Sequence, residues 1–325
     1  MPIDGTRLRI LVTGGAGFIG SHFCERLLER GHDVVCIDNF DPFYDPKLKR
    51  KNIANALSHP HYQLMEGDIL DRAFLEKVFD TGPFNAIVHL AARAGVRPSI
   101  QNPSVYQKVN IEGTLHLLEL AVRSKTPKFV FASSSSVYGK NNRLPFSEAD
   151  PADHPVSPYA ATKRAGELLS YTYHVLYGIS VHCLRFFTVY GPRQRPDMAI
   201  HQFIHRIATG KEIPLYGDGS ARRDFTYISD ILDGMEKSLF HCNGYAIYNL
   251  GESRTIDLLS LVSLIENALN KKAKIAWMPE QPGDVPVTYA DISKAQKELG
   301  YAPKVSIEEG IVKLVEWYLR TFGGC

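Results

Sequence analysis

The sequence contains few cysteines, and their spacing suggests neither a metal site nor disulfides. Five cysteines occur in 325 residues, an odd number, and no two of them have the C-x-x-C spacing that zinc ligands and redox pairs commonly share. A small disulfide-stapled domain, which needs regularly paired cysteines, is therefore not indicated. We expect instead a soluble protein of a reducing compartment, the cytoplasm.

Long apolar runs and a marked excess of either charge are also lacking. No apolar stretch approaches the roughly 20 residues of a membrane-spanning helix, and the start, MPIDGTRLRILVTGG, does not have the pattern of a signal peptide. The net charge is 37 − 35 = +2, so we expect neither a nucleic acid nor a membrane as a partner. The basic cluster 47-KLKRK-51 is short, and we interpret it as solvated surface rather than as a binding patch.

Strand-like and helix-like segments alternate through the first 190 residues. Apolar, β-rich runs predict strands at 9–12, 33–37, 62–66, 86–90, 128–132 and 180–186. Amphipathic stretches predict helices at 18–30, 71–79, 104–124 and 158–177. Such alternation is typical of an α/β fold with a Rossmann-type, doubly wound parallel sheet that helices cover on both faces.

After Tyr190 the alternation loosens, and loops rich in glycine, proline and arginine appear. Further helices are predicted near 256–270 and 306–320. We predict two partly interleaved units, namely a Rossmann domain of 1–189 plus about 229–252 and a smaller C-terminal lobe of about 190–228 plus 253–325. The segment 229–252 would return to the sheet of the first unit.

A glycine-rich turn, 13-TGGAGFIG-20, follows the first predicted strand and precedes the first predicted helix. Gly14, Gly17 and Gly20 allow a tight turn, a close approach of the backbone to a pyrophosphate, and packing of the helix on the strand. Asp38 ends the second predicted strand, where a carboxylate hydrogen-bonds the adenosine ribose and repels a 2′-phosphate. The pattern predicts NAD rather than NADP, although glycines also occur in purely structural turns.

Three further strand ends carry suitable residues. Asp68 follows the third predicted strand, and Ala91 and Ala92 follow the fourth, where their small side chains would let a cofactor lie close to the backbone. Four serines, Ser133 to Ser136, follow the apolar run 129–132 at the end of the fifth predicted strand. Because ligands collect at the carboxyl ends of parallel strands, we expect all of these residues at one crevice.

Tyr159 and Lys163 are four residues apart on a predicted helix, so they share one face of it. Ser157 and Pro158 precede them as a predicted N-cap and first helical residue. In a chain with 16 tyrosines such a pair also arises by chance. The position of the pair favours a functional role over chance, because the pair follows the fifth predicted strand and is expected beside the serine run.

These motifs together resemble the extended short-chain dehydrogenase/reductase family, over nearly the whole chain. The resemblance is carried by 13-TGGAGFIG-20, the HLAA at 89–92, Asn110, the serine run, Tyr159 with Lys163, and 184-LRFFTVYGP-192. It implies that Ser134, Tyr159 and Lys163 move a proton while NAD takes a hydride. A tyrosine with a pKa near 10 is a poor base at neutral pH, and a nearby ammonium together with the nicotinamide charge would lower that pKa.

By this resemblance Tyr159 is the base, Lys163 tunes it and holds the nicotinamide ribose, and Ser134 bonds the reacting hydroxyl. The NAD-binding residues that we expect are Gly14, Gly17, Phe18, Ile19, Gly20, Asp38, Asn39, Asp68, Ile69, Leu90, Ala91, Ala92, Asn110, Ser133, Tyr159, Lys163 and Phe186.

The serines also bear on the reaction. Relatives in this family begin by oxidising C4 of a nucleotide sugar; those that eliminate water carry Asp-Glu at the positions of Ser135 and Ser136, and those that decarboxylate a uronic acid carry Glu at the latter. This chain has two serines there. The resemblance therefore implies 4-epimerisation without net redox change, with tightly bound NAD that is regenerated in each cycle.

Three stretches, 38–46, 184–203 and 281–295, resemble the UDP-glucuronate 4-epimerase branch more than the UDP-galactose branch. The hydroxyls of Ser135, Ser136 and Thr188 would then surround the sugar C6 and accept its carboxylate. Alternatively they hydrogen-bond a neutral C6 hydroxyl or the cofactor, and the substrate is a neutral UDP-hexose or UDP-pentose.

The nucleotide end of the substrate is assigned by resemblance alone. Arg223 would bind a phosphate of UDP, Arg195 would lie beside the substrate, and Asp284 would contact the uridine ribose; either arginine could instead be solvated. Gln281 replaces an arginine that many relatives carry. The substrate-binding residues that we expect are Arg97, Ser134, Ser135, Ser136, Tyr159, Thr188, Arg195, Tyr216, Arg223 and Asp284.

Several alternatives remain at this point. His201 and His205 are spaced i, i+4, but no third ligand is evident and we expect no metal. An oxidoreductase with net turnover or a non-catalytic NAD-sensing protein would share the same fold. A homodimer through the helices at 104–124 and 158–177 is expected from the family, although Leu115, Leu118 and Tyr171 could equally belong to the core.

Overall fold

The computed structural model describes residues 6–140, 143–280 and 285–323. Gln281 and Asp284, which the sequence analysis assigned to the nucleotide end of the substrate, lie outside these residues. Within them, no helix is long and apolar enough to cross a membrane.

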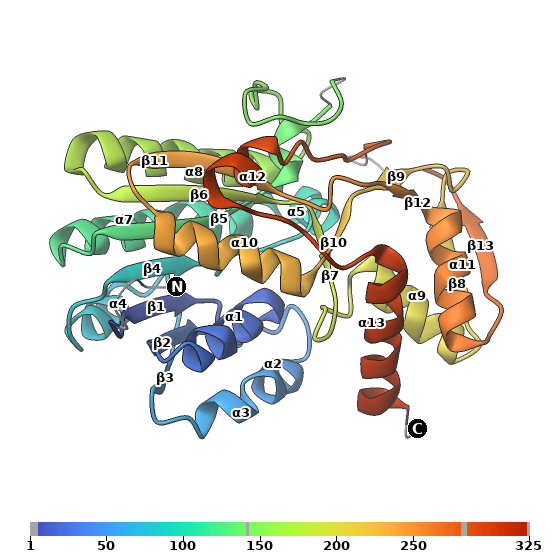
Figure 1. Cartoon of the computed structure of the whole chain (residues 1–325), viewed down its shortest axis with the longest axis horizontal. Helices are drawn as coiled ribbons and strands as arrows, with labels where there is room; N and C mark the ends of the chain where they lie inside the picture. Colours follow the sequence, from blue (N-terminus) through green and yellow to red (C-terminus); the bar gives the residue numbers. More distant parts are fainter. Residues whose placement is uncertain (1–5, 141–142, 281–284, 324–325) are drawn as a thin grey trace.

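A seven-stranded sheet in the order β11-β6-β5-β4-β1-β2-β3 forms the centre of the molecule (Figure 1). All of its neighbouring strands pair in parallel. The strands are β1 (Arg9–Thr13), β2 (Asp33–Asp38), β3 (Tyr62–Glu66), β4 (Ala86–His89), β5 (Lys128–Ser134), β6 (Ser180–Phe186) and β11 (Tyr245–Leu250). The predicted doubly wound α/β fold is confirmed, and the six predicted strands occur within two residues of their predicted ends.

Helices cover both faces of this sheet, because its strands carry apolar side chains on both sides. Ile10 and Val12 of β1 belong to one apolar cluster, whereas Leu11 between them belongs to another on the opposite face. The first cluster includes side chains of α1 (Phe18–Glu29) and α10 (Ile228–His241). The second includes side chains of α4 (Arg72–Phe79) and α7 (Gly113–Arg123). Leu118 of α7 is fully buried there, so it belongs to the core.

The predicted helix at 104–124 is interrupted. It consists of α6 (Pro103–Gln107), a π-helical turn η1 (Lys108–Glu112) and α7. The buried Asn110 lies in this turn, where its Oδ1 accepts from the Arg93 backbone N–H (2.8 Å) and its Nδ2 donates to Thr162 Oγ1 (3.0 Å). Such π-helical turns are frequent at functional sites, and this one ties the segment after β4 to the next long helix, α8 (Pro158–Tyr177).

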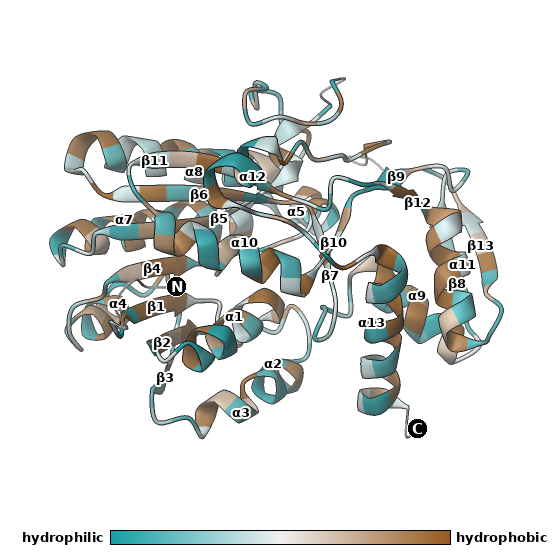
Figure 2. Cartoon of the chain, viewed as in Figure 1, coloured by the Kyte–Doolittle hydropathy of each residue, from teal (hydrophilic) through white to brown (hydrophobic). Residues whose placement is uncertain are grey.

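The C-terminal part contains three small two-stranded sheets that the sequence did not predict. They are formed by β7 (Thr188–Tyr190) with β10 (Phe225–Tyr227), β8 (Glu212–Tyr216) with β13 (Lys274–Met278), and β9 (Arg222–Arg223) with β12 (Ile256–Asp257). The helices α9 (Ala199–Ala208), α11 (Leu258–Leu269) and α13 (Ile307–Phe322) lie beside them, away from the main sheet (Figure 1). Figure 2 shows apolar and polar residues along α13, whose buried side includes Ile311, Leu314 and Val315.

Shorter elements complete the chain: α2 (Pro46–Asn52), α3 (Ala54–Leu57), α5 (Val96–Gln101), the 3₁₀ turn η2 (Ser135–Tyr138) and α12 (Ser293–Leu299). β11 pairs with β6 at the edge of the main sheet, and α12 packs on α10 and β11. Part of the C-terminal segment therefore covers the Rossmann sheet, and the exact division into two units stays a prediction.

Candidate active site

A cavity of about 530 Å³ lies at the carboxyl ends of the central strands. Its wall includes the glycine turn after β1, the loops after β2, β3 and β4, the serine run after β5, and Tyr159 with Lys163 from α8. Thr188 and Arg195 contribute from the C-terminal part. The crevice that the strand ends predicted is therefore present in the structure.

The glycine turn fits the pyrophosphate of a dinucleotide. Gly14 has φ +70°, and a Cβ there would lie only 2.7 Å from the backbone N of Ala91. Gly17 is the N-cap of α1, and no side chain caps the first N–H groups of that helix. Gly17 lines the cavity, and unsatisfied N–H groups at such a helix N-terminus can receive a phosphate.

The end of the cavity where we predicted the adenosine of NAD contains a buried carboxylate. Asp38 Oδ2 accepts from the Ala16 backbone N–H (3.1 Å), and Oδ1 accepts from the Phe40 backbone N–H (2.8 Å). Lys49 Nζ lies 3.9 Å from the same Oδ1 and 5.0 Å from the centre of the Tyr44 ring. The interpretation of 47–51 as solvated surface is wrong for Lys49, which is only 8% exposed because α2 turns it toward Asp38. Burial raises the pKa of Asp38, and the charge of Lys49 opposes that rise.

The loops after β2 and β3 are linked to each other at this end. Asn39 Nδ2 donates to Asp68 Oδ2 at 2.8 Å. The predicted residues that line the cavity are Gly14, Gly17, Phe18, Ile19, Gly20, Asp38, Asn39, Asp68, Ile69, Leu90, Ala91, Ala92, Ser133, Ser134, Ser135, Ser136, Tyr159, Lys163, Phe186, Thr188 and Arg195.

At the other end, α8 places Tyr159 and Lys163, the pair that the resemblance predicts to be catalytic, at the cavity. The Ser157 side chain accepts from the Ala160 backbone N–H (3.2 Å), so the predicted N-cap is confirmed and the helix begins one residue before Tyr159. Burial raises the pKa of Tyr159, while a hydrogen bond with Ser134 and the charge of Arg195 oppose that rise. The two groups therefore favour the phenolate that a tyrosine base needs.

Lys163 lies one turn further along α8 and is almost completely buried. Its Nζ donates to the Ala132 backbone carbonyl (2.7 Å) and lies 5.1 Å from the centre of the Phe131 ring. Burial lowers the pKa of Lys163 to about 8, and the carboxylate of Glu167 opposes that decrease. An effect of Lys163 on the pKa of Tyr159 stays a prediction.

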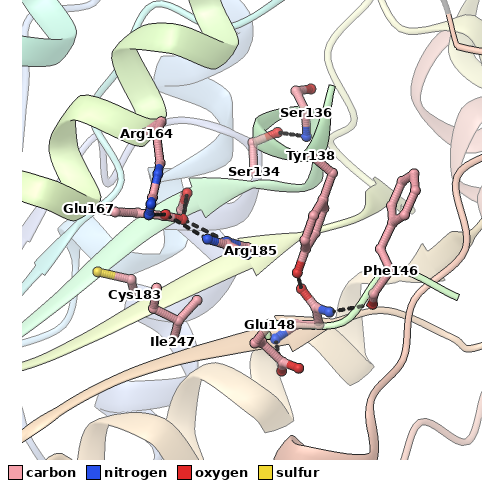
Figure 3. Close-up of polar contacts among 12 residues, drawn as sticks. Ser134, Ser136, Tyr138, Phe146, Glu148, Arg164, Glu167, Cys183, Arg185 and Ile247 are labelled. Atoms are coloured by element: carbon pink, nitrogen blue, oxygen red, sulfur yellow. Dashed lines mark hydrogen bonds and ion pairs between the residues drawn. The ribbon is translucent and has the colours of Figure 1, made fainter. Parts of the chain in front are cut away.

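The four serines have different surroundings, and Figure 3 shows two of them, Ser134 and Ser136. Ser133 Oγ points inward and donates to Glu167 Oε1 at 2.6 Å. Ser134 Oγ caps η2 by accepting from the Ser136 backbone N–H (3.2 Å) and also bonds Tyr159. Ser135 and Ser136 are partly exposed on the cavity wall. The hydroxyls of Ser134, Ser135 and Ser136 thus lie on the cavity wall, and only that of Ser134 is known to bond Tyr159, whereas the hydroxyl of Ser133 is engaged with Glu167.

A buried polar network lies behind the serine run, and the sequence analysis did not identify it. Arg185 of β6 binds Glu167 of α8 through Nε–Oε1 and Nη2–Oε2 contacts of 2.8 Å each, and Arg164 Nη1 donates to the same Oε2 (3.0 Å). The Arg185 guanidinium also lies over the Tyr138 ring (4.7 Å), and the Tyr138 hydroxyl donates to Asn249 Oδ1 (2.7 Å). Figure 3 shows how this network joins α8, β6 and η2.

The loop 40–46 closes one side of the cavity, and sequence reasoning found no physical signal for it. The guanidinium carbons of Arg93 and Arg195 lie 5.5 and 5.7 Å from the centre of the Phe43 ring. Arg93 Nη1 donates to Asp41 (2.7 Å), and Arg195 forks onto Asp197 with contacts of 3.0 and 2.9 Å. Arg195 therefore lies at the cavity, as the resemblance implied, and it already has a carboxylate partner.

Four predicted residues lie away from the described lining. Arg97 lies over the ring of Tyr216 (4.2 Å), which joins two segments far apart in the sequence. Arg223 Nη1 donates to the backbone carbonyls of Arg222 (2.9 Å) and Pro286 (3.2 Å). Asn110 supports the cavity from behind. The assignments of these residues to cofactor or substrate stay predictions.

The two histidines with metal-like spacing have other partners. His201 Nδ1 contacts the Gln194 carbonyl oxygen, and His205 Nδ1 contacts the Tyr318 hydroxyl, both at 2.8 Å. Among the residues that the structure describes, no group of three histidine, cysteine or acidic side chains could hold a metal ion.

Known proteins resemble this chain along most of its length. Residues 11–314 match the family model described as GDP-mannose 4,6 dehydratase. The chain is 46% identical over 335 residues to UDP-glucuronate 4-epimerase 5 of Arabidopsis thaliana, covering 98% of this chain and 77% of that one. It is also 46% identical over 308 residues to the UDP-glucuronate 4-epimerase of Thermodesulfobacterium geofontis, covering 94% and 95% of the two chains.

Solved structures also resemble this chain along most of its length. The UDP-glucuronic acid 4-epimerase of Bacillus cereus, crystallised with UDP-glucuronic acid and NAD, superposes with a TM-score of 0.92 at 37% identity and covers 97% of this chain and 100% of that one. A UDP-glucose 4-epimerase of Thermotoga maritima, with UDP-glucose, superposes with a TM-score of 0.89 at 32% identity and covers 97% and 99%.

Proposed function

Because this chain belongs to the extended short-chain dehydrogenases/reductases that the GDP-mannose 4,6 dehydratase model describes, we propose that it is an NAD-dependent UDP-glucuronate 4-epimerase. It would convert UDP-glucuronate to UDP-galacturonate and would act as an isomerase. One observation carries this choice of reaction. Among the described residues, the carboxylates that line the cavity are Asp38 at the end of β2 and Asp41 and Asp68 in the loops after β2 and β3, and none lies beside the serines.

The absence of a carboxylate beside Tyr159 among the described lining residues limits the chemistry. Elimination of water needs an additional acid and base next to the oxidised sugar. Among the described lining residues, the polar side chains at this end are serine and threonine hydroxyls, Tyr159, Lys163 and Arg195. We therefore expect a 4-keto sugar that forms here to be reduced again rather than dehydrated, with hydride returning to the same face of C4 or to the opposite one. Return of the hydride to the opposite face of C4 gives the 4-epimer.

The residues of the chain have distinct tasks in this reaction. When bound, NAD supplies the hydride acceptor for C4 and the hydride donor for the return. Tyr159 takes the proton of the C4 hydroxyl, Ser134 bonds that hydroxyl and Tyr159, and the buried Lys163 adds positive charge. After the sugar has turned, Tyr159 returns the proton to the oxygen at C4.

The hydroxyls of Ser135, Ser136 and Thr188 support a uronate as the substrate. A 4-keto uronate is a β-keto acid and loses CO2 when its C5–C6 bond aligns with the ketone π system. Hydroxyls that hold the carboxylate in a fixed plane would keep this bond out of alignment. All three line the cavity, and all three are partly exposed to it.

The substrate proposal is tested by incubating the purified protein with UDP-glucuronate, UDP-glucose, UDP-N-acetylglucosamine and UDP-xylose separately and resolving the products by NMR. We expect UDP-galacturonate without added NAD. Turnover of a neutral sugar only would contradict the uronate and would leave a neutral UDP-sugar 4-epimerase, of which the Thermotoga maritima protein is an example. An NAD-sensing protein without catalysis would convert none of them.

The carboxylate site is tested separately with Ser136→Glu and Thr188→Ala. We expect both variants to release UDP-pentose beside UDP-galacturonate, because the carboxylate is no longer held in place. Thr172→Ala is the matched control, since the exposed Thr172 hydroxyl bonds only the Leu168 carbonyl of its own helix. If neither pocket variant produced any UDP-pentose, the hydroxyls would not protect the carboxylate.

The outer face of α8 supports a homodimer. Large apolar side chains on this helix are more than half exposed, namely Leu168, Tyr171, Val175, Leu176 and Tyr177. A second copy of the chain would cover them, and Tyr171→Glu should then shift the protein from dimer to monomer in light scattering. We also propose the cytoplasm as the compartment, in agreement with four described cysteines that are buried free thiols.

A further inference from the structure

The turn at 191–194 follows β7, and its third residue has an unusual backbone conformation. The Gln194 backbone N–H donates to the Gly191 carbonyl (3.1 Å), Pro192 is the second residue, and Arg193 at the third position has φ +66°. A type II turn has this pattern, and glycine or asparagine normally occupies the third position because other side chains disfavour a positive φ. An arginine there has a backbone cost that its side-chain contacts must offset.

Arg193 and its neighbour Pro192 both bind the first half of α1. Arg193 Nη2 donates to Glu25 Oε1 (2.9 Å), and its Nη1 donates to Ser21 Oγ (3.2 Å). His22 Nε2 donates to the Pro192 carbonyl oxygen at 2.9 Å. Burial lowers the pKa of His22 to about 4, and the charge of Arg193 also lowers it, so the ring is neutral at pH 7. We call these three contacts the α1 clamp.

The α1 clamp connects the predicted pyrophosphate site with the other end of the cavity. Gly17, the N-cap of α1, lines the cavity, and Ser21 lies one turn further along the helix. Arg195 follows Arg193 by two residues and also lines the cavity, where its charge acts on Tyr159. Arg193 itself is not among the described residues of the lining. It can therefore affect a bound substrate through Arg195 but does not form part of the described wall.

The residue between the clamp and Arg195 is held as well. The Gln194 backbone carbonyl accepts from His201 Nδ1 (2.8 Å), and its side-chain Nε2 donates to the Val189 carbonyl (3.2 Å). Arg195 then forks onto Asp197. The path from α1 to the guanidinium of Arg195 thus has a contact at each residue.

We propose that Arg193 is a positioning residue for the substrate, which preorganises Arg195 at the cavity by attaching its segment to α1. The inference rests on the proposed function, in which Arg195 lies beside the UDP-sugar. Ordering a long side chain and its loop during binding costs free energy, and a loop that is already in place avoids this cost. The need for the clamp accounts for an arginine at a turn position that suits glycine.

The test compares the wild type with Arg193→Gly, Arg195→Ala and the double variant. Glycine suits the backbone of this turn, so Arg193→Gly should fold and retain NAD like the wild type. With UDP-glucuronate we expect this variant to raise KM about tenfold and to change kcat less than about threefold, as for the loss of one charge-assisted contact made equally in the ground and transition states. The double variant should match Arg195→Ala, because Arg193 acts through Arg195.

Glu25→Ala tests the clamp from the side of the helix. It should raise KM about threefold by itself, because one bond of Arg193 is lost, and should have no effect in the Arg193→Gly background. Lys125→Gly is the matched control. Lys125 also has a positive φ (+55°) and an exposed basic side chain, but it follows α7 and is not among the described residues of the cavity lining. Its KM should equal that of the wild type.

Two results would overturn the proposal in an active wild type. A KM of Arg193→Gly within about twofold of the wild type would show that the clamp does not support substrate binding. Additive effects of Arg193→Gly and Arg195→Ala would show that Arg193 acts independently of Arg195. If the wild type uses a neutral UDP-sugar, KM is measured with that sugar. A wild type that converts no UDP-sugar would overturn the proposed function and this inference together.

Discussion

Two buried carboxylates face cations behind the same cavity, and their surroundings differ. Glu167 receives two contacts of 2.8 Å from Arg185, a third hydrogen bond from Arg164 and a fourth from Ser133. Asp38 has two backbone N–H partners, and its cation remains 3.9 Å away. Arg185 is therefore hydrogen-bonded to Glu167 through two nitrogens, whereas Lys49 lies near Asp38 without a hydrogen bond.

The pKa values of the two carboxyl groups reflect this difference in hydrogen bonding. Burial alone would raise both pKa values, but the bonds from Arg185 and Ser133 hold the pKa of Glu167 below its ordinary value. Burial keeps the pKa of Asp38 above its ordinary value despite Lys49. The hydrogen bonds of Glu167 join β5, β6 and α8 to one another, whereas Asp38 forms no hydrogen bond with its cation. We infer that the first pair supports the catalytic geometry and that the second recognises the cofactor.

The largest effect is expected where the reacting group itself is removed. Tyr159→Phe should lower kcat about 10³-fold, because the proton at the C4 hydroxyl then has no base. Both ion pairs remain, so the variant should still fold and retain NAD, although the Tyr159 hydroxyl no longer contributes to its binding. The measurement is turnover of UDP-glucuronate by NMR. A variant with activity within tenfold of the wild type would show that another group is the base.

The next largest effect is a difference between the Glu167–Arg185 and Asp38–Lys49 pairs in their contribution to the free energy of unfolding. Glu167→Gln leaves the Arg185 guanidinium buried opposite a neutral partner, and we expect a loss of about 3–5 kcal/mol in the free energy of unfolding. Lys49→Met should cost less than half as much, because its contact is longer and Asp38 keeps both N–H partners. Urea unfolding of both variants measures the two losses. Equal losses would mean that the two pairs do not differ as described.

A smaller loss is expected for Ser133→Ala, which removes one bond to Glu167 and leaves the Arg185 pair in place. The cost should be about 1.5–3 kcal/mol, the usual range for a hydrogen bond to a charged group. A double-mutant cycle with Glu167→Gln measures the coupling. Additive losses in that cycle would show that Ser133 does not act through Glu167.

The pH dependence of stability should have opposite signs at the two carboxylates. The folded pKa of Glu167 is lowered, so its ionised form contributes stability above pH 4.5, and this is lost as the pH falls further. The folded pKa of Asp38 is raised, so its ionised form costs stability at neutral pH, and the cost disappears as the pH falls toward 3.8. The penalty of Glu167→Gln should therefore shrink on acidification, whereas that of Asp38→Asn should grow.

Urea unfolding between pH 7 and pH 3 checks these slopes. The same sign at both sites would contradict the comparison.

The smallest effect concerns an ion pair outside the cavity. Arg50 and Glu66 lie 2.8 Å apart, and both side chains are more than half exposed. Water and salt screen such a pair, so Arg50→Met should leave the urea midpoint unchanged. A clear loss would show that short distance alone, rather than burial with saturated hydrogen bonds, determines the contribution of a pair.

Much of the fold and of the site followed from local patterns. The strand periodicity, the glycine turn and the cap at Ser157 are encoded within a few neighbouring residues. The positions of the serines at the end of β5 and of Tyr159 in the first turn of α8 followed from them. The two ion pairs behind the cavity were not predicted. Lys49 lies in a basic run that looks solvated, and only the packing of α2 against the loop after β2 turns it toward Asp38.

The Glu167 network was missed for a related reason. Its members come from β5, β6 and α8, and no sequence spacing connects Ser133 with Arg185. Short strands such as β9 and β12, each of two residues, carry no periodicity that could be recognised. The π-helical turn around Asn110 likewise looks like an ordinary helix in sequence. Contacts between distant segments, rather than local preference, determine these features.

The most direct test of the proposed reaction uses UDP-glucuronate that carries deuterium at C4. The wild-type protein, without added NAD, is incubated in ordinary water, and the product is examined by NMR and mass spectrometry. The account predicts UDP-galacturonate that retains deuterium at C4, because the hydrogen leaves this carbon and returns to it without exchanging with water. Loss of the deuterium to solvent, or accumulation of an oxidised sugar in place of the epimer, would contradict it.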